Sequence, residues 1–465
     1  MLHPGPTLEG TVPRSRLRPL MTCLVLTTSL GALDQTVVAT ALPTIATHFD
    51  AVGSVAWVLT AYLLSMSVAM PVVGTLADRH GTVRVLRASV VLFVLASLVC
   101  AAAPSIEVLA AARALQGVGG AGMLVMPQAL VAEVVPARDR AAVLGPLGAV
   151  FAVATVAGPL LGGWLTDVGS WHWVFWINVP VGGVALVLAC TLLRAGPRRR
   201  TAERFDVAGT ALLALGTSAL AWSAAVLPRD GWAPVTAGAL VLTVVAVAAL
   251  VVHQLRSSAP LLPVAVLRTR GVVLSAFLAA VVGFGMFGVI AYVPSWVQGV
   301  HGTSATTSGV LLLPVTAGLV LGVNTSGQLV RRTGRWRRFP VGGCALAGTA
   351  AVVLATAGSH LGLVATAGVL VAFGLGAGSF MALLVVLAQD AAPPQAVAGT
   401  TGTIAYVRET GATLGTALLG GVVAAGLAAG ASYGTAFSAV FLTVAGAFAL
   451  GLVAALALPR TTLGP

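Results

Sequence analysis

Long apolar runs follow one another along almost the whole of this sequence. Each run has about 20 residues, the length of helix that crosses the roughly 30 Å hydrocarbon core of a bilayer. Of all residues, 58% are hydrophobic and only 8% are charged, too few polar side chains to cover a water-soluble surface. The sequence therefore predicts an all-α polytopic membrane protein with fourteen transmembrane helices. The runs lie near residues 20–42, 54–77, 85–103, 107–129, 143–165, 173–193, 207–227, 235–255, 272–297, 306–329, 339–357, 361–387, 402–426 and 435–458.

The distribution of arginine predicts the orientation of the chain. All 25 residues of the lysine-plus-arginine total are arginines, and cytoplasmic loops of membrane proteins are enriched in such charges. With a cytoplasmic N-terminus, only Arg229 lies outside, and only Arg113 and Arg408 lie within spans. This asymmetry predicts that residues 1–19 and 459–465 are both cytoplasmic tails. The high Ala, Gly, Val and Arg content without Lys is typical of GC-rich bacterial genomes, so we expect a bacterial inner (plasma) membrane.

The composition also excludes several classes of function. The net charge of +12 comes from short clusters between apolar runs, not from a basic patch with interleaved aromatics, so no nucleic-acid partner is expected. Because a Walker A motif needs a lysine, any energy must come from an ion gradient or a separate subunit. The seven histidines show no metal-binding spacing, and no Ser/His/Asp set can be assembled. We therefore expect no enzyme activity, no metal and no cofactor.

Two segments of the chain occur twice. Gly74–Gly81 (GTLADRHG) is matched by Gly327–Gly334 (GQLVRRTG), and Pro136–Gly163 aligns without a gap with Pro394–Gly421. Repetition of this kind indicates a duplication. It predicts two parallel six-helix halves, residues 20–193 and 272–458, joined by a linker, 194–271, that contains two extra helices. Two such halves around a central site form a transporter architecture in which one half moves against the other.

Polar residues inside apolar runs are the first candidates for function. Asp34 lies near the middle of the first run, where a charged carboxylate costs roughly 3 kcal/mol. It is either a structural hydrogen-bonding group or a protonatable site that carries a proton or meets a cationic substrate. Arg113 and Gln116 share one stripe of the fourth run. Arg113 either forms a fixed structural ion pair or lowers the proton affinity of a nearby acid.

The repeated loop is a candidate conformational gate. Its residues Asp78 and Arg79, with Arg84 beyond them, lie on the predicted cytoplasmic side between Gly74 and Gly81. They can form a charge relay between helix ends that stabilises one conformation and breaks in the other. The alternative is that the arginines only retain the topology.

The fifth run ends in GPLLGG, in which Gly158 and Gly162 form a G-x-x-x-G contact face and Gly163 completes the motif. Pro159 frees a backbone carbonyl and favours a kink. The second copy of this segment keeps only the last four letters. The first copy therefore has a role that the second lacks, such as a hinge or a seal.

Two charged residues stand side by side in the thirteenth run. Arg408 and Glu409 project about 100° apart on a helix, so they are not expected to share a face. Arg408 is expected to be a structural charge paired with a neighbouring helix or loop. Glu409 is a candidate to line the cavity.

Five ordered segments give the chain a family resemblance. LDQTVVATALP, GTLADRHGTVRVLR, RALQGVGGAG, GPLLGG with the following WHWVFWINVP, and GQLVRRTGRWRRFP resemble the fourteen-helix drug:proton antiporter branch of the major facilitator superfamily. The resemblance implies that GPLLGG marks an exporter, that the Gly74–Arg87 loop controls the conformational switch, and that Asp34 and Arg113 take part in proton coupling.

The function expected from this resemblance is proton-coupled export of a lipophilic small molecule, such as an antibiotic or antiseptic, by alternating access. The alternative is a dedicated exporter of one endogenous metabolite. The expected partners are the substrate, protons and membrane lipids, and a monomer is expected.

Overall fold

All of the secondary structure that the computed structural model describes is helical. The description covers residues 14–50, 56–193, 205–230, 233–257, 260–262, 266, 269–303 and 305–459. The helices are α1 (Arg14–His48), α2 (Ala56–His80), α3 (Thr82–Ala101), α4 (Ile106–Val134), α5 (Ala137–Val168), α6 (Trp173–Trp176), α7 (Asn178–Leu192), α8 (Val207–Asp230), α9 (Pro234–Arg256), α11 (Arg270–Val282), η1 (Gly283–Phe287), α12 (Gly288–His301), α13 (Ala305–Val310), α14 (Leu312–Thr333), α15 (Arg338–Ala357), η2 (Gly358–His360), α16 (Leu363–Asp390), α17 (Val397–Ala428) and α18 (Tyr433–Leu456).

Each of the fourteen apolar runs coincides with helix. Within the described residues, twelve helical segments are long and apolar enough to span a membrane. The other two runs correspond to α5, which has 32 residues, and to α8, whose described apolar stretch is Val207–Ser223. An all-helical fold with twelve candidate spans is thus shown, and the count of fourteen stays a prediction.

One expected helix contains an irregular turn. Between α11 and α12, the five residues Gly283–Phe287 form a π-helix, a wider turn that is frequent at functional sites. This turn packs against α17: a Cβ atom on Gly283 would overlap the carbonyl oxygen of Arg408. Glycine at this position therefore allows the two helices to approach closely.

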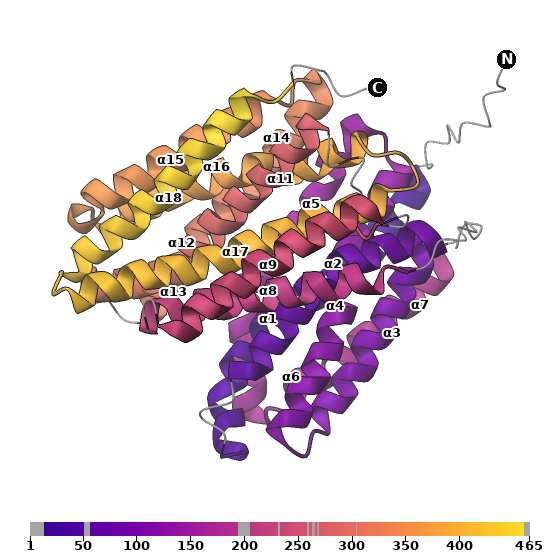
Figure 1. Cartoon of the computed structure of the whole chain (residues 1–465), viewed down its shortest axis with the longest axis horizontal. Helices are drawn as coiled ribbons and strands as arrows, with labels where there is room; N and C mark the ends of the chain where they lie inside the picture. Colours follow the sequence, from indigo (N-terminus) through magenta and orange to yellow (C-terminus); the bar gives the residue numbers. More distant parts are fainter. Residues whose placement is uncertain are drawn as a thin grey trace.

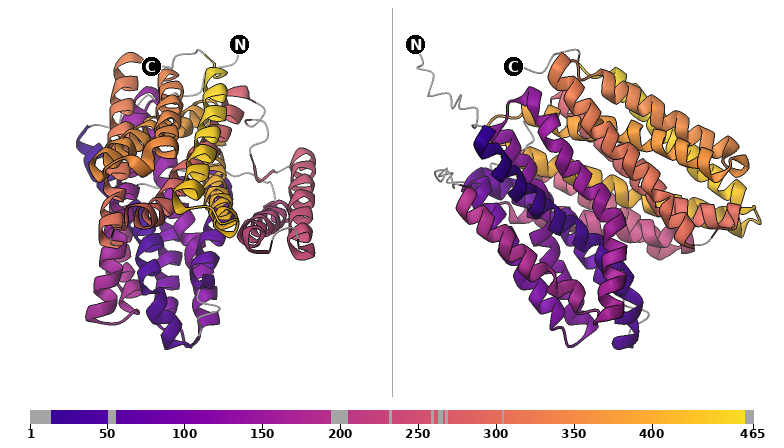
Figure 2. Two further views of the ribbon diagram at one scale, coloured as in Figure 1. Left: turned by 90° about the vertical axis from the view of Figure 1, so that its left-hand side faces the viewer. Right: turned by 180° about the vertical axis from the view of Figure 1, so that it is seen from behind.

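The helices form two bundles, α1–α7 and α11–α18, with α8 and α9 alongside them (Figures 1 and 2). The bundles lie close together at the end where α1 begins and α18 ends, and they diverge toward the opposite end. Two helix pairs, α2 with α17 and α5 with α14, make the main contacts between them. These pairs are equivalent under the sequence duplication, because α14 corresponds to α2 and α17 to α5.

Small residues bring these paired helices close together. A Cβ atom on Gly74 of α2 would overlap the carbonyl oxygen of Ala398, and one on Gly402 of α17 would overlap that of Met70. In the other pair, a Cβ atom on Gly327 of α14 would lie 2.8 Å from the carbonyl oxygen of Ala141. The backbones are therefore in contact at this end of the molecule.

The hairpin of α8 and α9 is fixed by a buried carboxylate. Asp206, just before α8, accepts hydrogen bonds from Gly209 N (2.8 Å), His253 Nε2 (2.7 Å), Gln254 Nε2 (2.8 Å) and Leu261 N (3.3 Å). Burial raises the pKa of Asp206, but the hydrogen bonds from His253, the Gly209 amide and Gln254 outweigh it and hold the pKa below its ordinary value of 3.8. The start of α8 is thereby tied to the end of α9.

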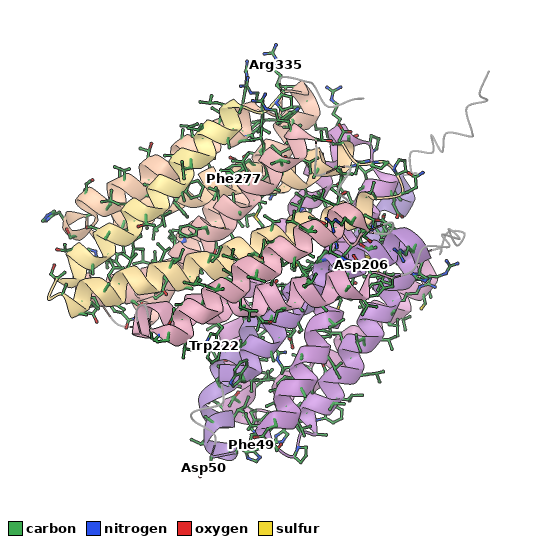
Figure 3. All side chains as sticks on the ribbon, viewed as in Figure 1. Phe49, Asp50, Asp206, Trp222, Phe277 and Arg335 are labelled. Atoms are coloured by element: carbon green, nitrogen blue, oxygen red, sulfur yellow. The ribbon has the colours of Figure 1, made fainter. Side chains whose placement is uncertain are left out.

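This hairpin contacts both bundles. Its Trp222 stacks on Trp57 at the start of α2 with ring centroids 6.5 Å apart, and Thr75 near the end of α2 donates to the carbonyl of Leu261 at 2.8 Å. The hydroxyls of Thr217 and Tyr406 are 2.8 Å apart and join α8 to α17. Figure 3 labels Asp206 and Trp222, which lie toward opposite ends of α8.

Candidate functional site

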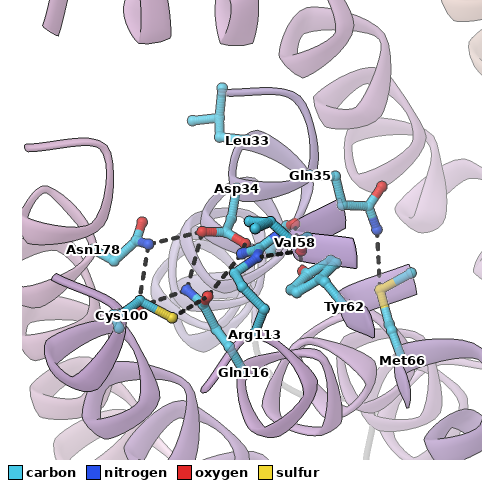
Figure 4. Close-up of polar contacts among 12 residues, drawn as sticks. Leu33, Asp34, Gln35, Val58, Tyr62, Met66, Cys100, Arg113, Gln116 and Asn178 are labelled. Carbon is cyan, nitrogen blue, oxygen red and sulfur yellow. Dashed lines mark hydrogen bonds and ion pairs between the residues drawn. The ribbon is translucent and has the colours of Figure 1, made fainter. Parts of the chain in front are cut away.

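A buried ion pair joins α1 to α4. Arg113 Nη1 lies 2.6 Å from Asp34 Oδ2, and both side chains are fully shielded from solvent. The same nitrogen donates to Gln116 Oε1 at 2.7 Å, and Gln116 Nε2 donates to Asp34 Oδ1 at 3.0 Å. The three residues selected from the sequence are therefore in direct contact (Figure 4).

Two further side chains, Asn178 and Ser97, extend this polar cluster. Asn178 Nδ2, at the start of α7, donates to Asp34 Oδ1 at 2.9 Å and to Ser97 Oγ of α3 at 3.2 Å. Gln116 Nε2 donates to the same Ser97 Oγ at 2.7 Å. The cluster thus links four helices of the N-terminal bundle. Sequence reasoning did not select Asn178 or Ser97, and the available signal for Asn178 was an amide within the apolar run near 173–193.

The neighbours of the Asp34 carboxyl group present hydrogen-bond donors to it. Arg113, Gln116 and Asn178 all approach the carboxylate through N–H donors, which require it to accept. The Tyr62 ring lies 4.0 Å from the Arg113 guanidinium carbon, a cation–π contact that further stabilises the charge. Arg113 Nη2 is buried and has no hydrogen-bond partner among the described residues.

Asp34 borders an apolar cavity inside the N-terminal bundle. This cavity of about 50 Å³ lies between α1, α5, α6 and α7, and its walls include Leu161 of GPLLGG, Val174 and Asn178. It is large enough for a water molecule, and Asp34 and Asn178 are the two polar residues among its described lining residues.

A second cavity lies between the two bundles and is called the central cavity below. Its volume is about 40 Å³, and it is lined from α1, α4 and α5 on one side and from α14, α16 and α17 on the other. From α1, Thr28 faces this cavity, whereas Asp34, six positions later, is not among the lining residues. The lining residues are Thr28, Leu124, Gln128, Leu144, Leu147, Gly148, Val323, Met381, Ala382, Val385 and Arg408.

Arg408 and Glu409 form an ion pair with each other. Arg408 Nη2 lies 2.9 Å and Nε 3.3 Å from Glu409 Oε1, and both side chains are nearly buried. Their Cα–Cβ bonds diverge as expected on a helix, but the two long side chains bend toward each other, so the described ion-pair partner of Arg408 is on its own helix and not on a neighbouring one. Arg408 reaches the central cavity, whereas Glu409 is not among its lining residues.

Within the repeated loop, Asp78 contacts the opposite bundle. Its Oδ1 accepts from Ala398 N at 3.0 Å and its Oδ2 from Gly399 N at 2.7 Å, at the first turn of α17. A carboxylate at a helix N-terminus satisfies free amides and interacts favourably with the helix dipole. Asp78 therefore joins the bundles through backbone groups.

The other gate residues lie close to Asp78. Gly81 ends α2 with a φ of 92°, a left-handed conformation that favours glycine. Arg84 Nη1 donates to the carbonyl of His80 at 2.9 Å, and Arg79 also has an interaction partner. Among these residues, Asp78 and Gly74 are the two with described contacts to α17.

The second copy of the loop also contacts the other bundle, but here a positively charged side chain meets backbone carbonyls, where Asp78 meets backbone amides. At the end of α14, Arg331 stands where α2 has Asp78. Here Arg138, at the start of α5, donates from Nε to the carbonyl of Arg331 at 2.9 Å and from Nη2 to that of Arg332 at 3.1 Å. A guanidinium at a helix C-terminus satisfies free carbonyls there.

GPLLGG brings α5 against α1. A Cβ atom on Gly158 would overlap Thr36 Oγ1, and one on Gly162 would overlap the Val37 carbonyl oxygen. Gly163 has no neighbour within 4 Å of such an atom. The backbone of α5 is helical through position 159, and the side chain of Pro159 lies outside the described residues.

No group of three or more His, Cys, Asp or Glu side chains with metal-binding geometry occurs in the described parts of the chain.

Comparisons with known proteins identify the family that has this helical architecture. The family model of the Major Facilitator Superfamily matches residues 24–416. An uncharacterized MFS-type transporter of Mycobacterium tuberculosis (strain ATCC 25618 / H37Rv) is 38% identical over 432 residues, which are 90% of this chain and 62% of that protein. The chain thus spans 62% of the length of that relative.

Two other proteins add to this comparison. The multidrug transporter protein MdtP of Bacillus subtilis (strain 168) is 30% identical over 414 residues, 88% of this chain and 76% of that protein. The solved structure of the proton:xylose symporter XylE superposes with a TM-score of 0.68 at 15% identity, over 97% of this chain and 98% of that chain, and this shows a shared fold. Fold and family indicate a multi-pass membrane protein. The chain belongs to the Major Facilitator Superfamily.

Proposed function

We propose that this protein is a proton-driven antiporter of the fourteen-helix branch, which exports lipophilic small molecules across a bacterial plasma membrane. The observation that carries the proposal is the fully buried Asp34–Arg113 pair in the N-terminal bundle. A buried carboxylate within a membrane span is costly and is typically a proton or substrate site. The likeness to a multidrug transporter of Bacillus subtilis supports export as the direction.

The arrangement of α1 suggests how protonation would act on the substrate site. Asp34 faces the polar cluster, while Thr28 on the same helix faces the central cavity. Protonation removes the charge that attracts Arg113 and leaves that guanidinium buried without its counter-ion, which is strongly unfavourable. We expect α1 to move against α4 in response, which would reshape the central cavity.

The conformation fits one state of an alternating-access cycle. The bundles touch where Asp78 and Arg138 cross between them and diverge at the other end (Figure 2). With both termini cytoplasmic, as the arginine distribution predicts, this is an outward-facing state. Substrate would be released to the outside in this state. It would be bound from the cytoplasmic side after the contacts at Asp78 and Arg138 break.

The test is substrate-driven proton movement in inverted vesicles, followed with a pH-sensitive dye. The wild type should release protons when a transported lipophile is added, and Asp34→Asn should not. Asp167→Asn, which changes an exposed carboxylate at the end of α5, is the matched control and should behave as wild type. Wild-type coupling in Asp34→Asn would remove Asp34 from the mechanism.

Because Asp34→Asn leaves Arg113 unpaired, its folding needs a separate check. The double variant Asp34→Asn/Arg113→Gln removes both charges, and it should fold and also lack coupling. A dedicated exporter of one metabolite is the alternative function, and it would respond to a single compound in a panel of unrelated lipophiles.

A further inference from the structure

The described hydrogen bonds of the Asp34 carboxyl group all run toward it. Its Oδ1 accepts from Gln116 Nε2 and from Asn178 Nδ2, and its Oδ2 accepts from Arg113 Nη1. A protonated carboxyl group must donate its O–H to an acceptor, but each oxygen of Asp34 faces an N–H group. At least one neighbour must therefore change its orientation before a protonated Asp34 can have all its hydrogen bonds satisfied.

The charged and titratable groups around Asp34 do not supply this acceptor. Arg113 has only donors, and the Tyr62 ring lies against its guanidinium, 4.0 Å from the central carbon. Cys100 Sγ donates to Gln116 Oε1 at 3.6 Å. Among the groups in contact with the carboxyl group, the two amide side chains are therefore the candidates. From α5 and α6, the described residues that line the cavity beside Asp34 are apolar: Leu161, Leu165 and Val174.

The amide of Gln116 is held in its present orientation. Its Oε1 accepts from Arg113 Nη1 at 2.7 Å as well as from Cys100 Sγ. Turning this amide over would place its NH2 group against the Arg113 guanidinium, which has no acceptor. The acceptor gained for Asp34 would thus be offset by a contact between two donors beside a buried charge.

The amide of Asn178 differs, because its oxygen is not committed. Its Nδ2 donates to Asp34 Oδ1 at 2.9 Å and to Ser97 Oγ at 3.2 Å, whereas its Oδ1 takes part in none of the described hydrogen bonds. Figure 4 shows the nitrogen turned toward Asp34 and the oxygen turned away. The last torsion of an asparagine side chain is broad and roughly two-fold, so both orientations are accessible. The side chain also borders the cavity of about 50 Å³, which has room for a water molecule that could accept from the turned NH2 group.

We propose that Asn178 is the positioning residue that adapts the cluster to protonation of Asp34, by turning its amide over so that Oδ1 accepts the acid O–H. In this arrangement Ser97, whose Oγ accepts from Gln116 Nε2 at 2.7 Å, can donate its own hydroxyl proton to the same Oδ1. The neutral acid then has an acceptor, and deprotonation reverses the change. Since Asn178 is the first residue of α7, the start of this helix responds directly to the charge on Asp34.

This inference rests on the proposed protonation of Asp34 in the export cycle, so the cluster and transport are measured separately. The sequence contains two asparagines, Asn178 and Asn324, so an isotope label on the asparagine side-chain carbonyl marks two groups, and Asn324→Gln removes one of them. Infrared difference spectra between neutral and acidic pH are recorded with the purified full chain in nanodiscs, without substrate. Proton release on addition of a lipophile is followed in inverted vesicles.

Acidification should produce the C=O band of a hydrogen-bonded carboxylic acid, which is missing in unlabelled Asp34→Asn. The labelled carbonyl of Asn178 should shift to lower wavenumber over the same pH range, because it gains O–H donors. Asn178→Leu keeps the approximate shape of the side chain without its polar atoms, so it should shift the acid band to higher wavenumber, the position of an acid without an acceptor. Ser97→Ala disturbs the same cluster but keeps the amide, so this matched control should leave the acid band at its wild-type position.

The outcomes separate this inference from the proposed function. An acid band that forms while the Asn178 carbonyl stays unchanged would overturn the role of Asn178, as would a band that Asn178→Leu leaves in place or that Ser97→Ala shifts as far. The absence of any acid band would overturn it together with the proposed proton site. The expected spectra without proton release from vesicles would support the role of Asn178 and count against proton-coupled export. If Asn178→Leu does not fold, the labelled carbonyl of the wild-type protein decides alone.

Discussion

The contact between Asp78 and α17 should decide how firmly the bundles are held together at this end. Asp78→Asn keeps the shape of the side chain but removes its charge and one of its two accepting oxygens. Hydrogen bonds to charged groups contribute about 1.5–3 kcal/mol, and a charge at a helix N-terminus contributes a further 0.3–1 kcal/mol or so. Because Asp78 is only half-buried, we take about 2 kcal/mol for the loss.

A loss of this size should change the populations measurably. About 2 kcal/mol corresponds to a change of roughly 30-fold in the ratio of closed to open molecules. A closed:open ratio of about 100:1 would fall to about 3:1, a clearly visible minor state. The assay is the distance distribution between spin labels on introduced cysteines at His80 and Thr333, two exposed positions on different bundles. Cys190, the one exposed native cysteine of the described residues, is first replaced by alanine.

The control is another carboxylate at the same end of the molecule. Asp139 is half-exposed and lies 3.8 Å from the exposed Arg331, a surface pair that contributes little. Asp139→Asn should therefore leave the distance distribution unchanged. If Asp78→Asn also leaves it unchanged, or if both variants broaden it equally, the contact of Asp78 with the α17 amides does not hold the bundles together.

Two further predictions concern the stability of the fold. Gly162→Ala should destabilise the protein by about 1–3 kcal/mol because the added Cβ overlaps the Val37 carbonyl oxygen. Gly163→Ala, where the added Cβ has no close neighbour, should be neutral or stabilising by up to about 1 kcal/mol. Thermal unfolding in nanodiscs compares the two variants, and equal losses of stability would contradict the packing argument. Asp206→Asn should cost about 1–3 kcal/mol at neutral pH because it weakens the bonds that close the α8–α9 hairpin. Because the pKa of Asp206 is lowered in the folded state, its contribution to the free energy of unfolding is present above the ordinary pKa of 3.8 and is lost as the pH falls through the lowered pKa. The stabilities of wild type and variant should therefore converge in acid. A difference in stability that persists in acid would contradict this assignment.

The helical architecture was predictable because the thickness of the bilayer sets the length of each apolar run. Each apolar run had to satisfy its own backbone groups, so helix was the expected solution throughout. A close approach of α5 to a neighbouring helix followed from the spacing of Gly158 and Gly162, since small residues four apart share one face, but the structure was needed to identify α1 as that neighbour. The interruption at Gly283–Phe287 left no comparable pattern in the sequence.

The site was predictable only where its residues share a helix or carry a charge. Arg113 and Gln116 lie three positions apart, so their common face could be read directly. Asn178 and Ser97 reach Asp34 from other helices, and no spacing along the chain records that proximity. The partner of Asp78 was invisible for a different reason, because backbone amides at positions 398 and 399 have no side-chain signature.

The contacts of Asp78 and Arg138 place unequal demands on the two halves of the protein. In all four of these hydrogen bonds, the N-terminal half supplies a side chain, Asp78 or Arg138, and the C-terminal half supplies only its main chain. Residues 331, 332 and 398 can therefore change identity without losing these bonds. A substitution at position 78 or 138 has no such freedom, so the sequence constraint that these four bonds impose falls on the N-terminal half.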